Sequence, residues 1–510
     1  MPIYQLQLGQ QHKTFDTKCG GKMLKIDEIK TFIDNDAASA KKQQAEVGVN
    51  YYRAKHDILK YKIYFMDKDG VLREDLIKSN IRIPHPFFTE IVDQAVQYVL
   101  SGDDAFIKSD DPELQKELNA YFNDNEDFIA ELYELLTGCL VKGFEYMYAY
   151  QGKDDRLAFQ TADSMGVVKV KEKETDDKCE YVIWWYVDSI GKNNTKIKRI
   201  QVWDKNETHF FCQEGDGKIV KDKSEKINPK PHKMWKENGV EGTLFEGFGF
   251  IPFFCLENNQ KQTSDLHPIK ALIDSYDLMN AGLANNIQDT NEATYAISGY
   301  EGDNLDELLF TLRAKKGIGV GEGGNVEVLT VNIPVEARKA KMEIDEKNIY
   351  RFGMGLNTAG LKDTNATTNL AIKSAYSLLD LKATKLIIKL KQFFRKLLTP
   401  VLDEINQRNG SAYEQKDVYF NFAPEVPTNE QENAQIELTD AQRKQTEINT
   451  VLNIATHLDN ETVVKLICEQ LELEFDDIKD KLPKPEDDGL VAAENVLKKE
   501  QIEQEIVEIP

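Results

Sequence analysis

Paired carboxylates are the feature of this sequence closest to chemistry. Asp274 and Asp277 lie three residues apart in a long helical pattern, so their side chains share one helix face. Such a pair can bind a divalent metal or act as catalytic acids. No histidine or third carboxylate accompanies the pair at a metal-ligand spacing, which favours a solvated or interface face. A metal-dependent enzyme acting on nucleic acid is the alternative.

Nucleotide-binding and calcium-binding motifs are matched only in part. Gly319, Gly321 and Gly324 have the spacing of the dinucleotide fingerprint, but that motif lies between a strand and a helix. Here a strand pattern follows the glycines, which favours a hairpin turn. The DKDG stretch at 67–70 lacks the later acidic ligands of a calcium loop and is also predicted to be a hairpin turn.

The other reactive residue types form no known motif. The seven histidines include no HExxH grouping, the serines no GxSxG elbow, and the six cysteines no CxxC pair. No phosphate-binding loop of the GxxxxGK[ST] type occurs. The sequence therefore predicts free thiols in a reducing cytosol, with no catalytic residue, no metal site and no cofactor.

The charge balance argues against tight binding of nucleic acid. The 510 residues include 87 acidic and 64 basic side chains, which gives a formal net charge of −23. Proteins that grip DNA through its phosphates usually have a basic footprint. The exception is the segment 373–396, where Asp380 is the only acidic residue among six lysines and one arginine. We expect this cationic helix to meet either phosphate or an acidic protein surface.

Hydrophobic patterning predicts an α+β chain of more than one domain, because 510 residues exceed a single core. Helical patterns dominate residues 87–142, and β-rich runs separated by turn residues fill 144–254. No run of 18 apolar residues occurs, and the first fifteen residues contain no apolar h-region. Neither a membrane-spanning helix nor a secretory signal is expected.

Two long helices enclose a small α/β unit in the next part of the chain. Residues 268–293 and 334–356 read as helices, each with a proline in its first turn. The intervening residues 295–333 contain short strand and helix patterns. A polar loop at 357–367 leads into a helical pattern of about forty residues, which Pro400 should kink or split.

Short motifs follow one another in a recognisable order between residues 51 and 355. They are YY at 51–52, HDIL at 56–59, NIRIPHPFF at 80–88, IVDQ at 91–94, IPFF at 251–254, SDL at 264–266, IDSYD at 273–277 and IYRFGMG at 349–355. In this combination the chain resembles the portal proteins of tailed bacteriophages, in the branch found in long-tailed phages of Gram-positive hosts. The resemblance covers roughly residues 40–410.

The resemblance implies a portal fold and a domain order. The wing would be an α+β domain, the stem a helix pair, the clip a small α/β unit, and the crown helical. The expected boundaries are 1–40 for an N-terminal segment, 41–267 for the wing, 268–294 and 334–356 for the stem helices, 295–333 for the clip, 357–367 for a tunnel loop, 368–410 for a long kinked wing helix, 411–474 for the crown and 475–510 for an acidic tail.

The same resemblance implies three sets of site residues. The stem helices leave apolar side chains that identical neighbours in a ring would cover, and these are Leu272, Ile273, Tyr276, Leu283 and Ile287. The tunnel loop would face DNA through Asn357, Thr358, Lys362, Asp363, Thr364 and Asn365. The clip would dock partner proteins through Tyr300, Asp306, Glu307, Lys315 and Lys316.

The function implied is a non-enzymatic ring, commonly of twelve subunits, at one capsid vertex. Double-stranded DNA would pass through it during packaging and ejection, with transient and non-specific contacts. Implied partners are the terminase large subunit, a head-completion adaptor, and the major capsid and scaffolding proteins. Assembly would occur in the host cytoplasm, and no membrane is involved. Besides the metal-dependent enzyme, another phage neck or tail ring adaptor is an alternative, which the length and the clip insertion disfavour.

Overall fold

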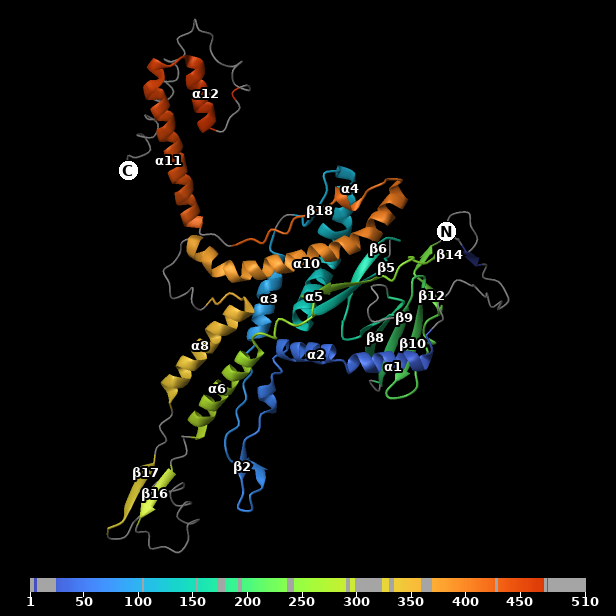
Figure 1. The fold of residues 1–510 in the computed structure, drawn as a ribbon, viewed down its shortest axis with the longest axis vertical. Coiled ribbons are helices and arrows are strands. Elements are labelled where there is room, and N and C mark those ends of the chain that lie inside the picture. Colours follow the sequence, from blue (N-terminus) through green and yellow to red (C-terminus); the bar gives the residue numbers. More distant parts are fainter. Residues whose placement is uncertain are drawn as a thin grey trace, which may run out of the picture. The chain divides into compact units, whose positions relative to one another are not determined.

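The computed structural model shows a chain that divides into two compact units (Figure 1). The larger unit comprises residues 1–365 and 373–426, and the smaller comprises residues 366–372 and 427–510. The structure describes residues 4–6, 24–102, 105–152, 155–171, 179–190, 195–235, 243–289, 294–298, 323–329, 334–358, 369–426, 430–471 and 475.

Helices form the first part of the larger unit, and local sequence sets several of their ends. Asn125 accepts a hydrogen bond from the backbone N–H of Phe128 at the start of α5, and Gly143 ends that helix with a left-handed φ of 91°. Ser39 caps α2 and Asp111 caps α4 in the same way as Asn125. The helices are α1 (Ile26–Ala37), α2 (Ala40–Tyr52), α3 (Phe87–Val99), α4 (Pro112–Leu118) and α5 (Glu126–Lys142), with a 3₁₀ turn at Asp57–Lys60 and a π turn at Asn119–Asn123.

Antiparallel sheets follow α5. A six-stranded sheet has the order β11-β10-β9-β8-β7, with β12 also paired to β10. Its strands are β7 (Val167–Val170), β8 (Tyr181–Ile190), β9 (Thr195–Trp203), β10 (Glu207–Glu214), β11 (Val220–Lys221) and β12 (Lys230–Pro231). Alternating side chains of this sheet pack against α1 through Ile29 and Ile33, so the sheet covers its apolar face with that helix.

The other strands of the first 260 residues, together with β18 from near residue 420, form four smaller sheets. Three strands order as β15-β5-β6 and three as β1-β14-β13, and the pairs β2-β3 and β18-β4 are separate ribbons. The strands are β1 (Tyr4–Leu6), β2 (Tyr64–Met66), β3 (Leu72–Glu74), β4 (Ile107–Lys108), β5 (Phe144–Gln151), β6 (Leu157–Ala162), β13 (Lys233–Trp235), β14 (Thr243–Glu246), β15 (Phe253–Glu257) and β18 (Tyr419–Phe420), the last preceded by a 3₁₀ turn at Gln415–Asp417.

Two long helices then frame the ribbon formed by β16 and β17. The helices are α6 (Lys270–Asp289) and α8 (Val335–Gly353), and the strands are β16 (Thr294–Ser298) and β17 (Asn325–Leu329). Strand β17 begins directly after Gly324, so a strand follows that glycine, as predicted; Gly319 and Gly321 lie outside the described residues.

The main core forms where α3, α5 and α10 (Asn369–Asn409) meet. Helix α10 inserts apolar side chains at helical spacing, including Leu386, Leu390, Phe394 and Val401, all of which are buried. The helix continues through Pro400, so of the two predicted effects of that residue, a kink or a split, the structure excludes the split. The smaller unit contains α11 (Glu430–Ile454), a 3₁₀ turn at Ala455–His457 and α12 (Asn460–Gln470).

The structure confirms the predicted α+β class and the predicted hairpin turn. Residues 67–70 form a hairpin turn between β2 and β3, in which Asp67 Oδ1 accepts from the backbone N–H groups of Asp69 and Val71. One cation of the 373–396 segment meets an acidic group of its own chain, because buried Lys382 forms an ion pair with Asp265 at 2.8 Å. Lys382 is therefore unavailable to phosphate.

Candidate functional site: the α6–α8 helix pair

Helices α6 and α8 pack against one another through polar contacts. Ser275 of α6 donates a hydrogen bond to Asp345 of α8 at 3.0 Å, and Lys341 bonds both of them. Gly282 lets Arg338 lie across the pair, because a Cβ at that position would lie 2.7 Å from the Arg338 guanidinium. These contacts hold the two helices as one hairpin-like body, which we call the helix pair.

One face of α6 is covered by an extended segment of the same chain, residues 79–85, which we call the strap. The backbone N–H groups of Ser79, Ile81 and His85 donate to side chains of α6 at 3.1, 2.6 and 3.0 Å. The acceptors are Asp289, Asn285 and Asp277, which are separated by four and by eight residues and so lie along one helix face. The strap thereby satisfies its own backbone donors on polar side chains of α6.

Asp277 is the centre of a buried cluster at the base of the helix pair. Its two oxygens lie 2.7 Å from Nδ1 of His56 and 2.7 Å from Nδ1 of His85. His56 stacks on the ring of Tyr51, with ring centroids 4.4 Å apart, and Asn280 lies 2.6 Å from Nε2 of His85. Burial opposes ionisation of Asp277, but the hydrogen bonds from both histidines outweigh burial and lower its pKa.

Asp274 has different partners from Asp277. It accepts hydrogen bonds from the Tyr51 hydroxyl and from Lys270 Nζ, the latter at 2.7 Å. Lys270 also contacts Asp57 at 2.7 Å. Burial and the hydrogen bond to Asp274 raise the pKa of Tyr51, so the phenol stays protonated as a donor. Together Tyr51, His56, His85, Lys270, Asp274 and Asp277 form what we call the junction cluster.

The junction cluster corrects the sequence interpretation of Asp277, whereas Asp274 is partly exposed. Asp277 has no exposed surface, so it is neither solvated nor at an interface. Its oxygens are occupied by protein donors, and those of Asp274 by Tyr51 and Lys270. The hydrogen bonds and ion pairs of the cluster hold the segments 51–57 and 80–88 against the start of α6. No pattern of spacing along the chain could have paired His56 and His85 with Asp277.

The predicted apolar contact residues of α6 differ in how far their own chain covers them, and Leu272 and Tyr276 pack partly against the main core. Leu272, Tyr276, Leu283 and Ile287 lie along one side of α6, away from Asn285 and Asp289. Tyr276 contacts the rings of His85 and Phe87 edge-on, whereas Ile287 is 52% exposed. Ile273 is wrong as a contact residue, because it is fully buried in the core of its own chain. Consecutive helix residues are about 100° apart, so Ile273 points into the core while Leu272 lies at its edge, partly buried.

The predicted tunnel loop and clip fall largely outside the described residues. Asn357 and Thr358 are described, and Asn357 donates to Glu346 at 3.3 Å. A hollow of about 350 Å³ lies beside Asn357 where α8 ends, and Lys347 and Arg351 are among the residues that line it. The residues outside the described part are Lys362, Asp363, Thr364 and Asn365 of the loop and Tyr300, Asp306, Glu307, Lys315 and Lys316 of the clip.

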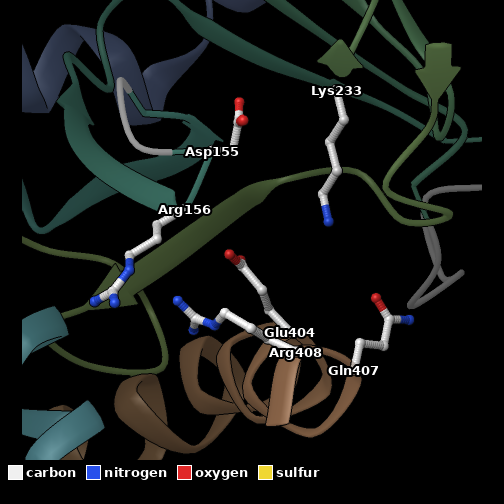
Figure 2. Close-up of a pocket in the computed structure, with 6 residues that line it drawn as sticks. All are labelled: Asp155, Arg156, Lys233, Glu404, Gln407 and Arg408. Atoms are coloured by element: carbon white, nitrogen blue, oxygen red, sulfur yellow. The ribbon is translucent and has the colours of Figure 1, made fainter. Parts of the chain in front are cut away.

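A second hollow, of about 290 Å³, lies between α10 and the strands of the larger unit (Figure 2). Figure 2 shows Glu404, Gln407 and Arg408 on α10 below Asp155, Arg156 and Lys233. Arg156 and Arg408 both approach Glu117, at 3.8 and 3.4 Å, and Glu404 accepts from the backbone N–H of Leu157 at 3.1 Å. Arg156, Glu404 and Arg408 therefore already have partners, and the contacts of Glu404 and Arg408 connect α10 to β6 and α4.

One further group of possible metal ligands exists among the described residues. Asp204, Glu207 and His209 bring ligand atoms within 4.8 Å of one another at the turn between β9 and β10. Asp204 already accepts from two backbone N–H groups of that turn, at 2.7 and 2.8 Å, and His209 pairs with Glu207 at 3.3 Å. The turn and this ion pair account for the closeness of the three side chains.

In the described part of the chain, no helix is both long and apolar enough to cross a membrane.

Comparison with known proteins matches most of the chain to one family. The family model described as phage portal protein, SPP1 Gp6-like, matches residues 32–480. The portal protein of Bacillus phage SPP1 is 28% identical over 341 residues, which cover 66% of this chain and 65% of that protein. The portal protein of Clostridium phage phiCD119 is 25% identical over 403 residues, which cover 74% of this chain and 82% of that protein.

A solved structure titled as the neck of a native GTA particle, computed with C12 symmetry, is also similar to this chain. The sequence identity is 11% and the TM-score is 0.36, over 75% of this chain and 89% of that one.

Proposed function

This chain belongs to the phage portal protein family of the SPP1 Gp6-like type, and on that premise we propose that its copies form a closed ring through which double-stranded DNA passes. The family match over residues 32–480 carries the proposal. The helix pair supports it, because Leu278 and Ile344 are 40% and 56% exposed and identical neighbours would bury them. A heterologous contact that closes on itself leaves a central opening.

The ring would occupy one vertex of the capsid, after assembly in the host cytoplasm. It would bind the terminase large subunit during packaging, then a head-completion adaptor, and it would contact the major capsid and scaffolding proteins. Hydrolysis of ATP belongs to the terminase in this proposal, and the ring itself is a conduit and docking surface. Twelve copies is the number that the family resemblance implies.

Each part of the chain has a role in the proposed ring. Residues 41–267 form the wing, with the N-terminal segment 1–40 before it, and the helix pair forms the stem at 268–294 and 334–356. Residues 295–333 form the clip that docks partners, and 357–367 form the tunnel loop that faces DNA. The remaining parts are the long wing helix at 368–410, the crown at 411–474 and the acidic tail at 475–510.

The charge of the chain suits a conduit through which DNA must slide. Strong contacts from lysine and arginine to phosphate release counterions and hold DNA in place. Each copy has a net charge of −23, so a ring of such copies repels the phosphate backbone over most of its surface. Lys362, the one cation of the tunnel loop, would then supply brief contacts only.

Imaging of the purified chain tests the proposal. Negative-stain electron microscopy is expected to show rings with a central opening, and mass photometry a species of many subunits. A protein that stays monomeric at all concentrations would overturn the proposal. A nuclease assay with magnesium tests the enzyme alternative, which requires activity that Asp274→Ala removes.

The tunnel loop is tested by deletion of residues 358–366 in a phage that carries this chain. Rings and empty capsids are expected to form, because the deletion spares the helix pair. Packaging or retention of DNA is expected to fall. Normal DNA content in the deleted phage would show that the loop has no such role.

A further inference from the structure

A hairpin at residues 61–78, which we call the arm, carries the densest group of exposed apolar side chains in the described part of the chain. Strands β2 and β3 form a ribbon of their own, apart from the larger sheets (Figure 1). Met66, Leu76 and Ile77 are 70%, 86% and 95% exposed. The other exposed apolar residues of the arm are Tyr61, Tyr64, Phe65, Val71 and Leu72.

The register of the arm places an apolar surface on one side. Tyr64 pairs with Glu74 and Met66 with Leu72, so these four side chains point to the same face. Lys62 neutralises Glu74 at 2.7 Å, and Arg73 neutralises Asp67 at 2.5 Å. A partner could therefore cover Tyr64, Met66 and Leu72 without desolvating an unpaired charge next to them.

Hydrogen bonds hold the base of the arm in place, although its tip is uncovered. Asn80 donates to the backbone carbonyl of Tyr61 at 3.2 Å, and Arg82 donates to that of Leu59 at 2.8 Å. Directly after the arm, the strap is bound to α6 through Asp289 and Asn285. These bonds fix the base of the arm beside the helix pair of its own chain.

An isolated two-stranded ribbon is marginally stable in water, and an apolar face that nothing covers adds to the cost. The helix pair also has an uncovered apolar surface, on which Leu278 of α6 and Ile344 of α8 are exposed. Both surfaces belong to one compact unit and leave each other uncovered within the chain. Two different surfaces that do not meet within a copy can meet between copies, and such a contact is heterologous.

We propose that the arm of each copy packs its Tyr64, Met66 and Leu72 face on the outer surface of the helix pair of the next copy. The occupant of the arm's apolar face is thus a second copy of this chain. The inference rests on the proposed ring and adds the element that joins neighbours. In this contact the ribbon of one copy lies on the helix surface of the next. Because the base of the arm is bound to its own chain, the arm can reach the neighbour on one side only.

Assembly of arm variants tests the inference. The double variant Met66→Asp and Leu72→Asp is expected to raise the concentration at which rings form at least tenfold, measured by mass photometry. The matched control is Val187→Asp, because Val187 is 54% exposed on β8, in a different sheet. Circular dichroism spectra that match the wild type establish that both variants fold.

The outcomes separate the inference from the proposed function. Wild-type protein that forms no rings contradicts the proposed function itself. If the arm variant and Val187→Asp both form rings at the same concentration as the wild type, the arm inference alone is overturned. Loss of assembly in the arm variant only supports it.

Cross-linking locates the contact independently of folding losses. A photoreactive phenylalanine analogue is introduced at Met66, and rings are assembled from a mixture of ¹⁴N-labelled and ¹⁵N-labelled chains. Mixed-isotope cross-links to peptides from 270–289 or 335–353 are expected. Cross-links confined to a single chain, or to peptides of the wing, would overturn the inference.

Discussion

Asp277 shows how a charge is kept in a place that water does not reach. Its side chain is fully buried, and burial alone would raise the pKa of a carboxyl group. Hydrogen bonds from His56 and His85 outweigh that effect and lower the pKa. A carboxyl group with a lowered folded pKa stabilises the fold above its unfolded pKa of about 4, and this stability is lost as pH falls through the folded pKa.

Asp277→Asn should loosen the base of the helix pair. The amide removes the charge that both histidines contact, and breaking a buried charged contact of this kind costs about 3 kcal/mol. Hydrogen exchange of the amides in 51–57 and 79–85 is expected to accelerate by about 100-fold at neutral pH. Mass spectrometry of exchanged peptides measures the change.

Asp274→Asn is the control for this substitution. Asp274 and its partner Lys270 are partly exposed, so we expect a loss below about 1 kcal/mol. Equal effects of the two substitutions would contradict the central role of Asp277 in the junction cluster.

His232 gives the larger unit a second dependence on pH. Its ring stacks between Trp203 and Phe248, and its Nδ1 accepts from the backbone N–H of Phe248 at 3.4 Å. Burial lowers the pKa of His232 to about 4. Between pH 4 and about 6.5 the unfolded chain binds a proton that the folded chain excludes, so stability falls as pH drops through this range.

Acidification from pH 7 to pH 5 should therefore cost about 2 kcal/mol through His232 alone. His232→Phe keeps an aromatic ring in the stack and removes the titrating group, so this variant should lose less stability over the same range. Urea unfolding followed by tryptophan fluorescence measures the difference. His457→Phe, at an exposed residue of the smaller unit, is the control and should retain the full pH dependence. A pH dependence in His232→Phe equal to that of the wild type would contradict the assignment.

At the scale of elements, close helix packing depends on residues without side chains. Helix α2 crosses α5 at Gly48, where a Cβ would lie 2.0 Å from the backbone oxygen of Val141. Backbone cannot move aside as the end of a flexible side chain can. Tyr51 lies one turn after Gly48 in α2, and the chain continues from there to His56. The position of α2 therefore also sets the position of the junction cluster.

Gly48→Ala should separate α2 from α5 and destabilise the larger unit by about 3 kcal/mol, the upper range for overpacking. Thermal unfolding measures the loss. Gly70→Asn is the matched control, because Gly70 has a φ of 77° in open space and asparagine tolerates this conformation. A melting temperature of Gly48→Ala equal to that of the control would show that the helices adjust without cost.

At the scale of the whole molecule, the larger unit leaves apolar surfaces that one copy does not bury. The predicted contact residues Leu272, Tyr276 and Leu283 are half-buried, Ile287 is more exposed, and the arm is exposed along its length. A chain with several such surfaces gains free energy by assembly, at about 25 cal/mol for each Å² of apolar area removed from water. The proposed ring is the closed form of that assembly.

Leu283→Asp should weaken assembly while leaving the fold of the larger unit intact. A charge on the apolar face of α6 would have to be desolvated at the neighbour's surface, at a cost of about 2 kcal/mol or more for each contact. The yield of rings in size-exclusion chromatography is expected to drop, with an unchanged circular dichroism spectrum. Wild-type ring yield would contradict a role of this face in packing between copies.

The sequence by itself determined the class of the fold, the two long helices and the family. These properties rest on local periodicity, on capping residues such as Asn125 and Gly143, and on motifs that keep their order along the chain. Tertiary structure alone decided the partners of Asp277, the burial of Ile273 and the pairing of Lys382 with Asp265. The physical reason is distance along the chain, because contacts between residues far apart in the sequence depend on packing that no local pattern encodes.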